Sequence, residues 1–361
     1  MHLKILVLPG DGIGPEVTRE AVRVLEHVAR KFGHTLQLTE GLLGGVAIHK
    51  TGKPLPEETE RLALEADATL MGAVGLPEFD TAPPERRPER GLLEIRKLLG
   101  VFANLRPVVA YESLLASSPL KDAIVRGVDM IIVRELTGGI YYGTPRGVSV
   151  TNGERVAVNT MVYRQSEIER VARMAFNLAR QRRKKVTSVD KANVLENSEM
   201  WRQVVTEVAR EFPDVALDHL LVDNCAMQLV LNPRRFDVLL TENLFGDILS
   251  DEGAVLAGSI GMLPSASIGE RNAHGVWTGL YEPVHGSAPD IAGQNKANPL
   301  GAIGSVAAML SYSFSLAEEA RAVERAVEKV LASGRVTADL KPAGAPASTE
   351  EVGRAVCEAI G

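Results

Sequence analysis

The sequence predicts an α/β protein. Short apolar segments rich in β-branched residues alternate along the chain with segments whose apolar residues recur at helical spacing. The length of 361 residues indicates two domains or one large domain. A hydrophobic content of 45% and a charged content of 24% are ordinary for a globular protein that folds in water.

The elements follow from these patterns in chain order. The first strand, at 3–8, leads into a helix in which Pro15 suits the first turn and Val17, Ala21 and Val24 begin an apolar stripe. Further strands are predicted at 35–39, 68–72, 128–133, 156–162, 185–189, 215–222 and 236–240. Further helices are predicted at 57–66, 92–99, 166–181, 199–211, 247–258, 299–313, 316–332 and 350–360. The stretch 80–90 is rich in proline and charge, which predicts a mobile loop or an active-site lid.

Composition excludes several classes of protein. A net charge of −6 and a pI near 5.8 argue against nucleic acid as the main partner. Cys225 and Cys357 lie far apart and match no disulfide framework or zinc site, which fits a reducing, cytoplasmic compartment. The N-terminus lacks the apolar core and cleavage site of a signal peptide, and no apolar run reaches transmembrane length. We therefore expect no membrane partner.

The stretch 241–252, TENLFGDILSDE, carries the clearest chemical signal in the chain. Asp247 and Asp251 lie four residues apart at the start of a predicted helix, so both carboxylates share one helix face. Apolar neighbours indicate that part of this helix is buried, and unpaired carboxylates are costly to desolvate. A hard cation such as Mg²⁺ or Mn²⁺ is a fitting partner. The alternative is an acidic pair on a solvated face near the helix N-terminus.

Three arginines form a second group of candidate residues. Arg134 ends a strongly apolar strand, Arg106 lies in FANLRP, and Arg96 belongs to a predicted helix. Guanidinium groups bind carboxylates in a bidentate manner, so a cluster of them would suit a dicarboxylic or tricarboxylic acid. The alternative for each arginine is an ion pair with a structural carboxylate, such as Glu135 for Arg134.

Three more polar residues follow glycine-rich or strand segments. Tyr141 lies between glycines in TGGIYYG, which indicates either a special backbone path near a ligand or a plain hairpin turn. Lys191 comes directly after a strand, where it is a candidate proton donor or acceptor or a salt-bridged lysine. Asp223 follows another strand and is either a third metal ligand or a helix N-cap.

Two loops are well defined by their composition. Residues 10–15, GDGIGP, form a glycine-rich turn between strand and helix, but they fail the G-x-G-x-x-G template of dinucleotide binding. A plain tight turn is therefore the default interpretation. The loop YEPVHGSAPDI at 281–291 holds His285, and the histidines show no metal-ligand spacing.

Taken in order, these segments resemble a known family. GDGIGPEV, RGLLEIRKLLGVFANLRPV, VRELTGGIYYG, VDKANVLE, ENLFGDILSDE and YEPVHGSAPDIAGQNKANP are similar to the motifs of β-decarboxylating dehydrogenases. That family includes isocitrate and 3-isopropylmalate dehydrogenases, and the resemblance to the second group is the closer one. It runs nearly from end to end of the chain.

The resemblance implies an isopropylmalate dehydrogenase-like α/β fold that is not a Rossmann fold. Its first domain, which binds the cofactor, is discontinuous, and we place it at 1–101 and 259–361. A central domain at 102–258 carries substrate, metal and dimer contacts. The family forms homodimers with shared active sites, and by position Lys191 and Asp223 are the residues that each site takes from its neighbour.

The resemblance also implies the reaction and the site residues. The expected reaction is the NAD-dependent oxidative decarboxylation of 3-isopropylmalate to 4-methyl-2-oxopentanoate in leucine biosynthesis. Tyr141 and Lys191 would be catalytic, and Asp223, Asp247 and Asp251 would bind Mg²⁺ or Mn²⁺. The substrate would be bound by Glu89, Leu92, Leu93, Arg96, Arg106, Arg134 and Asp223. NAD would be bound by Ile13, Glu282, His285, Gly286, Ser287, Ala288, Asp290, Ile291 and Asn298.

Two other functions stay open at this point. The first is a dehydrogenase of the same family that acts on isocitrate, homoisocitrate, tartrate or malate. Glu89, Leu92 and Leu93 argue against it, because they suit an isopropyl group better than a third carboxylate. The second is a non-catalytic regulatory subunit, which would be expected to lack part of the acidic set. All of Tyr141, Lys191 and the three aspartates are present.

Overall fold

The computed structural model describes residues 1–272 and 275–361. The chain divides into two compact units. Unit 1 comprises Met1–Val101, Ala110–Asp122 and Ala254–Gly361, and unit 2 comprises Phe102–Val109 and Ala123–Gly253. Unit 1 thus holds residues 110–122 and 254–258, which the predicted division assigns to the central domain. Hydrogen bonds explain their place: the Ser117 hydroxyl donates to the Leu340 carbonyl (2.7 Å) and the Ser118 hydroxyl to the Val255 carbonyl (3.2 Å).

Unit 1 contains five strands in the spatial order β2-β1-β3-β12-β11. Strands β1, β2, β3 and β12 run parallel to one another, and β11 is antiparallel to β12. Their bounds are β1 His2–Gly10, β2 Thr35–Glu40, β3 Ala68–Ala73, β11 Pro264–Arg271 and β12 Trp277–Pro283.

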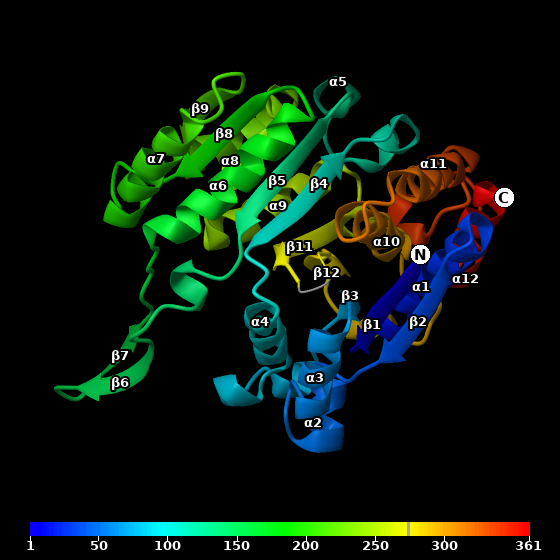
Figure 1. Ribbon diagram of the computed structural model, residues 1–361, viewed down its shortest axis with the longest axis horizontal. Coiled ribbons are helices and arrows are strands. Elements are labelled where there is room, and N and C mark those ends of the chain that lie inside the picture. The colour runs from blue at the N-terminus through cyan, green and yellow to red at the C-terminus, as the bar shows by residue number, and fades with distance from the viewer. Residues whose placement is uncertain (273–274) are drawn as a thin grey trace. The chain divides into compact units, whose positions relative to one another are not determined.

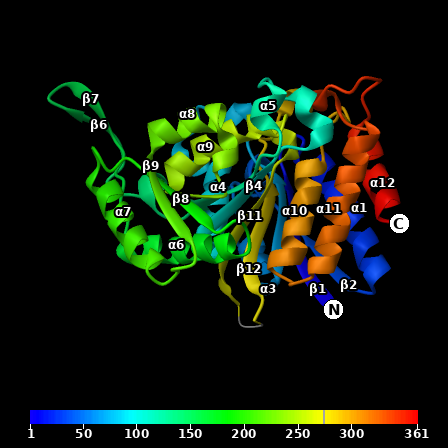
Figure 2. The ribbon, with the colours of Figure 1, turned by 90° about the horizontal axis from the view of Figure 1, so that it is seen from above.

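Helices cover the strands of unit 1. Helices α1 and α10 pack on the strands, and α11 and α12 pack against them in turn (Figure 2). Another core includes Leu6 and Leu8 of β1, Ala63 of α3 and Ile95 of α4. The bounds are α1 Gly14–Phe32, α2 Gly45–Thr51, α3 Glu57–Glu65, α4 Pro88–Leu98, α10 Leu300–Tyr312, α11 Ala317–Ser333 and α12 Thr349–Ile360.

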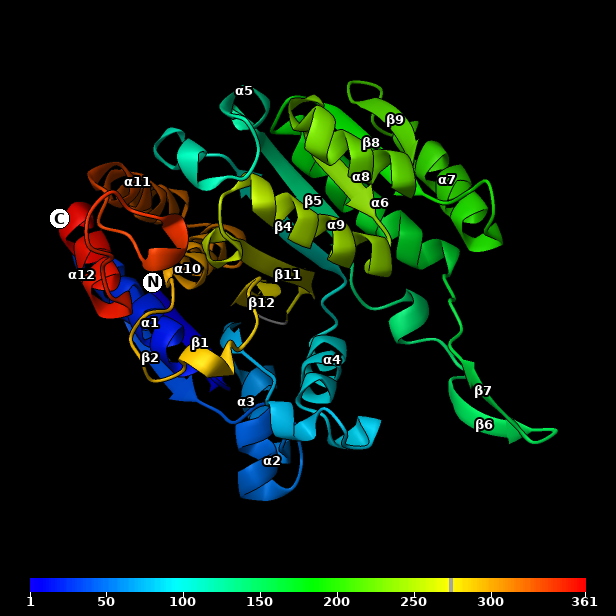
Figure 3. The same ribbon diagram turned by 180° about the vertical axis from the view of Figure 1, so that it is seen from behind.

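Unit 2 contains five strands in the order β4-β5-β10-β8-β9. Strand β4 is antiparallel to β5, and the other neighbours are parallel. Helices α6 and α7 lie over one face (Figure 1), and α8 and α9 lie over the other (Figure 3). The strands are β4 Ala103–Val109, β5 Asp129–Glu135, β8 Lys185–Asp190, β9 Ala216–Leu221 and β10 Val238–Thr241. The helices are α5 Asp122–Val125, α6 Gln165–Arg180, α7 Glu196–Ala209, α8 Val222–Leu231 and α9 Asn243–Leu256.

A two-stranded hairpin extends away from the sheet of unit 2 (Figure 1). It consists of β6 Gly147–Thr151 and β7 Glu154–Val158, and every residue in both strands is exposed. An isolated hairpin is at best marginally stable in water. Its strands gain no stability from burial within the described chain.

Most predicted elements are confirmed with shifted ends, but the prediction omits strands β4, β6, β11 and β12 and helices α2, α5 and α8. Three segments differ in detail from the prediction. The stretch 80–90 contains a 3-10 turn at Pro84–Arg86, and α4 begins at Pro88 because proline suits the first helical turn. The strand predicted at 156–162 is β7, which ends at Val158. The helix predicted from 247 begins at Asn243, because the Glu242 carboxylate accepts the N–H groups of Leu244 (3.0 Å) and Phe245 (2.6 Å).

Both cysteines are free thiols. Across the described ranges, no helix combines the length and the apolar character needed to cross a bilayer.

Candidate active site

The candidate residues of unit 2 gather where its parallel strands end. Arg134 is the last residue but one of β5, and β10 leads through Glu242 into α9, which carries Asp247 and Asp251. Lys191 directly follows β8, and Asp223 lies in the first turn of α8, directly after β9. Ligands of open parallel sheets bind at the carboxyl ends of the strands. The topology therefore gives these residues a common edge.

Helix α9 holds Arg134 along its whole side chain. The Asn243 side-chain oxygen accepts hydrogen bonds from Nε (3.0 Å) and one terminal nitrogen (2.7 Å) of Arg134, which is 3% exposed. Its other terminal nitrogen donates to Asp247 Oδ1 (2.5 Å). Gly246 leaves room for the stem, since a Cβ there would lie 2.7 Å from Arg134 Cγ. The guanidinium is thus fixed before any ligand binds.

Arg106 approaches the same carboxylates from β4. Its Nε donates to the Asn104 side-chain oxygen (2.8 Å), and a terminal nitrogen donates to the Ser250 hydroxyl (2.5 Å). The guanidinium lies 3.7 Å from Asp247 and 3.6 Å from Asp251. Two arginines therefore flank an acidic pair, an arrangement that can bind both a cation and the carboxylates of a substrate.

Tyr141 completes this cluster. It ends the 3-10 turn Gly139–Tyr141, and its hydroxyl donates to Asp247 Oδ2 (2.9 Å). Burial, together with the neighbouring Asp247 carboxylate, raises the pKa of Tyr141 to about 12. The phenol therefore keeps its proton at neutral pH, as a proton donor must.

The donor set around Asp247 and Asp251 fits a hard divalent cation. Both groups are carboxylates on one helix face, and oxygen ligands are those that Mg²⁺ and Mn²⁺ prefer. The pKa of the Asp251 carboxyl is raised, mainly by burial. The Arg106 charge lowers this pKa in part, and the Asp247 charge raises it further. Within residues 1–272 and 275–361, no three acidic, histidine or cysteine side chains gather as a metal site. One chain thus supplies the pair Asp247 and Asp251 but not the predicted third ligand beside them.

Lys191 and Asp223 form a pair with each other. Lys191 Nζ donates to Asp223 Oδ1 at 2.6 Å. The hydrogen bond from Lys191 lowers the pKa of the Asp223 carboxyl, whose side chain is 61% exposed. Leu221 holds the N-cap position of α8 and Asp223 is the second residue of the helix, so the alternative interpretation of Asp223 as an N-cap is wrong. Asp223 is exposed and Lys191 is partly exposed, so both side chains can be reached from outside the chain.

The candidate substrate residues of unit 1 lie on α4. Arg96 is buried and paired with buried Glu282 of β12 at 2.5 Å. Leu92 packs against the core that Leu6 and Leu8 help to form. Leu93 is half-buried and Glu89 is exposed. Leu92 is thus partly a core residue, which the sequence leaves open.

The candidate cofactor residues lie around the loop after β12. Ile13 donates its N–H to the Ser287 carbonyl (2.8 Å), and a Cβ on Gly12 would lie 2.0 Å from that oxygen. Burial lowers the pKa of His285, whose Nε2 is buried and finds no hydrogen-bond acceptor or donor in the described chain. A buried imidazole nitrogen without a partner fits a site that a polar ligand completes. Gly286, Ala288, Asp290 and Ile291 line the same loop.

Asn298 has structural partners. Its amide nitrogen donates to Asp339 (3.0 Å), and its oxygen accepts the Leu300 N–H at the start of α10 (3.0 Å). Any contact with a cofactor would add to these bonds.

Several residues of the site have no counterpart among the predicted ones. Asn243 and Ser250 hold the two arginines, and both lie inside the stretch 241–252 that the sequence singles out. Asp11 accepts the N–H groups of Gly45, Val46 and Gly75, each at 2.8 Å. A carboxylate inside a glycine-rich turn is a usable signal, because such turns leave backbone N–H groups for it to bind.

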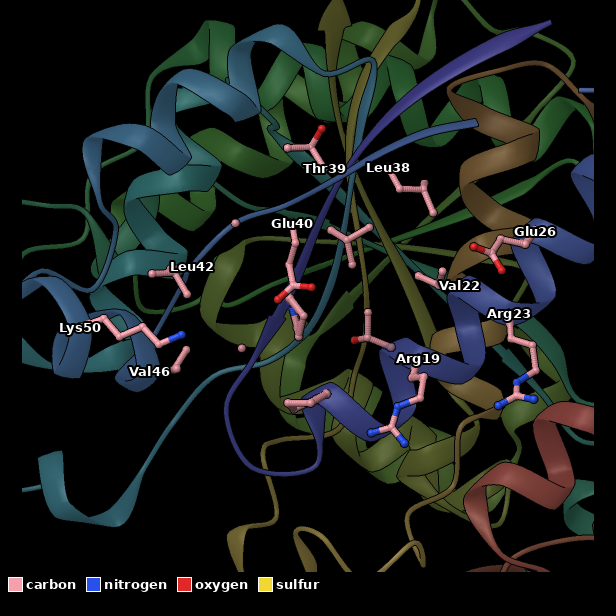
Figure 4. Close-up of a pocket in the computed structure, with 16 residues that line it drawn as sticks. Arg19, Val22, Arg23, Glu26, Leu38, Thr39, Glu40, Leu42, Val46 and Lys50 are labelled. Carbon is pink, nitrogen blue, oxygen red and sulfur yellow. The ribbon is translucent and has the colours of Figure 1, made fainter. Parts of the chain in front are cut away.

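Unit 1 also contains a cavity of about 800 Å³ (Figure 4). Its walls include Arg19 and Glu26 from α1, Glu40 from β2 and Lys50 from α2. Of the residues that line it, none is a predicted site residue.

Comparison with known proteins defines the class of protein. A model of the isocitrate/isopropylmalate dehydrogenase family matches residues 4–356. The chain belongs to this family, and the predicted family and its α/β fold are confirmed.

Individual relatives narrow the similarity within the family. The chain is 61% identical over 343 residues to a 3-isopropylmalate dehydrogenase of Geobacillus kaustophilus, covering 95% of this chain and 91% of that protein. It is 57% identical over 361 residues to a 3-isopropylmalate dehydrogenase of Shouchella clausii, covering 100% and 98%. A solved isocitrate dehydrogenase from Methylococcus capsulatus is 37% identical with a TM-score of 0.88, covering 100% and 99%.

Proposed function

We propose that this chain is an NAD-dependent 3-isopropylmalate dehydrogenase. It oxidises 3-isopropylmalate at C2 and releases CO₂, which yields 4-methyl-2-oxopentanoate in leucine biosynthesis. Full-length similarity to proteins of that name supports the substrate. The observation that carries the chemistry is the cluster in which Arg106, Arg134 and Tyr141 surround Asp247.

The residues of this cluster match the steps of the reaction. Arg106 and Arg134 bind the substrate carboxylates and orient the hydroxyl-bearing carbon. Asp247 and Asp251, with Asp223 from a neighbouring subunit, would hold Mg²⁺ or Mn²⁺. A cation bound there would acidify the hydroxyl and stabilise negative charge on its oxygen.

The proton transfers belong to two other residues. Lys191, in its neutral form, takes the hydroxyl proton as C2 is oxidised. NAD bound at the loop after β12 would accept the hydride from C2. The resulting β-keto acid breaks its bond to the carboxylate and releases CO₂, which leaves an enolate. Tyr141 donates its proton to the enolate carbon, and the raised pKa of its phenol keeps that proton in place until then.

A substrate panel tests the proposal. NADH formation is measured with 3-isopropylmalate, isocitrate, malate and tartrate in the presence of Mg²⁺ or Mn²⁺. We expect 3-isopropylmalate to have the highest kcat/KM. Isocitrate is the relevant rival, since an isocitrate dehydrogenase shares this fold at 37% identity. Equal efficiency with isocitrate would contradict the proposed substrate, and no NADH with any substrate would favour a non-catalytic subunit.

Leu93 should contact the isopropyl group of the substrate and favour it over malate. Three buried carbons at about 0.8 kcal/mol each give about 2.4 kcal/mol, or roughly a 50-fold preference over malate. We expect Leu93→Ala to erode the ratio of kcat/KM for 3-isopropylmalate over malate and to leave metal affinity unchanged. Leu92→Ala should lower the midpoint of denaturant unfolding as well, because Leu92 also packs on the core. An unchanged ratio in both variants would show that the leucines serve only the core.

The cofactor should be NAD. Asp290 lies in the exposed 3-10 turn Pro289–Ile291, and we place its carboxylate at the 2′-hydroxyl of the adenosine ribose. The same charge repels the 2′-phosphate of NADP, and Ile291 offers that phosphate no hydrogen-bond donor. We expect kcat/KM to favour NAD strongly, and Asp290→Asn to reduce the ratio. Comparable efficiency of the wild type with NADP would refute this assignment.

The active sites should be shared within a homodimer. Helices α8 and α9 lie side by side in unit 2 (Figure 3), and they expose Met227, Leu231 and Ile248, the last at 60%. The exposed hairpin β6–β7 adds Val148 and Val150. Exposed apolar patches of this kind indicate a protein interface. Because Asp223 begins the helix that carries Met227 and Leu231, a contact through α8 would bring the Lys191–Asp223 pair to the neighbour.

Sedimentation tests the oligomeric state. We expect the wild type to sediment at twice the chain mass of 38.8 kDa. The double change Met227→Asp and Leu231→Arg should produce monomers without activity, because charges replace the apolar contact. A monomeric wild type with full activity would contradict the dimer. The cytoplasmic location follows from cysteine usage alone and stays a prediction.

A further inference from the structure

Glu16 of the opening glycine-rich motif binds a distant loop. It lies in the first turn of α1 and is 8% exposed. Its carboxylate accepts the Gly293 N–H on one oxygen and the Asn295 N–H on the other, the second at 3.0 Å. A buried carboxylate with two backbone donors forms charge-assisted hydrogen bonds that fix the backbone it binds.

The bound loop is the one that carries Asp290 and Ile291. Residues 293–296 are exposed, and internal bonds join Gln294 to the Asp290 carbonyl (2.7 Å) and to the Ile291 carbonyl (3.2 Å). Gly293 and Asn295 have positive φ angles of 75° and 56°. An exposed loop with positive φ angles has few internal contacts that stabilise a single conformation.

Two fixed points outside the loop supply that conformation. At the start of α12, the Thr349 N–H donates to the Asn295 carbonyl (3.0 Å) and the Glu350 N–H donates to the Asn295 side-chain oxygen (3.1 Å). Glu16 holds the loop on the side nearer Asp290, at Gly293. The same motif also binds the preceding segment, since the Ile13 N–H donates to the Ser287 carbonyl (2.8 Å). The start of α1 therefore forms hydrogen bonds with the loop on both sides of residues 288–292.

We propose that Glu16 is a positioning residue for the adenosine half of the cofactor. It touches neither cofactor nor substrate and acts through the backbone of Gly293 and Asn295. By fixing that backbone, it fixes the position of the Asp290 carboxylate, which binds the 2′-hydroxyl of the adenosine ribose. The inference rests on the proposed function, because it takes Asp290 and Ile291 as the adenosine-binding pair. It also gives a role to the opening segment GDGIGPEV, which does not match the G-x-G-x-x-G template of dinucleotide binding.

Glu16→Gln tests this role. A glutamine has only one acceptor oxygen, and its NH₂ group would face a backbone N–H that also donates. We expect KM for NAD to rise about tenfold, with kcat and the KM for 3-isopropylmalate within about twofold of the wild type. Calorimetry with ADP-ribose, which keeps the adenosine half and lacks the nicotinamide, should show the same loss of affinity. This binding measurement does not depend on turnover.

Glu26→Gln is the matched control. Glu26 lies on the same helix and is exposed, and it lines the cavity of Figure 4 instead of the loop. It should leave both the KM for NAD and the affinity for ADP-ribose unchanged. Glu16→Asp, which keeps the charge but shortens the reach, should give an intermediate loss and serves where the glutamine variant does not fold.

The outcomes separate this role from the proposed function. Unchanged affinity for ADP-ribose in a folded Glu16 variant would overturn the inference, and so would an equal rise in KM for NAD and for 3-isopropylmalate. If the wild type oxidises no substrate with NAD, the proposed function fails. ADP-ribose binding to the wild type and the variants still decides the role of Glu16.

Discussion

Asp247→Asn should lower turnover by roughly 10²- to 10³-fold and remove the dependence of activity on Mg²⁺ or Mn²⁺. Partners of the carboxylate include Arg134 at 2.5 Å, Arg106 at 3.7 Å and the Tyr141 hydroxyl at 2.9 Å. An amide keeps the size of the side chain but loses its charge. The amide would therefore no longer help to hold a divalent cation. Without that cation the negative charge on the enolate oxygen would lack its stabilising counter-charge, although the two arginines would remain.

A matched control separates this effect from general loss of charge. Asp214→Asn also removes a carboxylate from unit 2, but its partners are Arg180 (2.8 Å) and Lys184 (3.6 Å) on the surface, so turnover should stay at the wild-type level. Steady-state rates are measured across a titration of Mg²⁺ and Mn²⁺, and circular dichroism confirms that both variants fold. Unchanged activity of Asp247→Asn, or full wild-type activity in excess EDTA, would show that the aspartates bind no catalytic metal.

The elements that the sequence predicts well are those whose apolar pattern serves only packing. Strand β1 is an example, since its buried residues are aliphatic apart from Gly10. Strand β4 is missed because Asn104, Arg106 and Pro107 interrupt its apolar run. Asn104 and Arg106 are nevertheless buried, because they bind each other and face the site. Local rules fail here where function places polar groups in a strand.

Helix α8 is missed for a different reason. Its sequence, VDNCAMQLVL, has apolar residues on the exposed side as well as the buried side, so no amphipathic period stands out. Met227 and Leu231 are exposed in a single chain, and the proposed dimer would cover them. A pattern that a second subunit explains is not readable from one chain taken alone.

The site residues divide in the same way. Those inside conspicuous segments, such as Tyr141 and Asp247, can be picked from the sequence because aspartates at helical spacing and flanking glycines are local signals. Asn243 and Ser250 hold Arg134 and Arg106, which lie more than 100 positions away in the chain. Spacing carries no information about such contacts. Their roles become visible only when the strands bring the segments together.

Lys191→Met and Tyr141→Phe should block different steps of the reaction. Without Lys191 the hydroxyl proton has no acceptor, so hydride transfer should slow by roughly 10²- to 10⁴-fold. Without the Tyr141 hydroxyl, which is held 2.9 Å from Asp247, oxidation should proceed and the release of product should slow. Rapid mixing that follows NADH and CO₂ separately distinguishes the two. Equal slowing of both signals in both variants would contradict the assigned roles.

The proposed sharing of sites turns Lys191→Met and Asp247→Asn into a test of each other. Each variant alone should be nearly inactive. In a mixed dimer, one site combines the intact Asp247 of one chain with the intact Lys191 of the other, and the second site carries both defects. Unfolding and refolding an equal mixture should therefore restore roughly a quarter of wild-type activity, because half the dimers are mixed and half their sites are intact. Matched refolding of each variant alone should restore none. If the mixture stays as inactive as its components, Lys191 serves the site of its own chain, and the exposed Lys191–Asp223 pair is not donated to a neighbour.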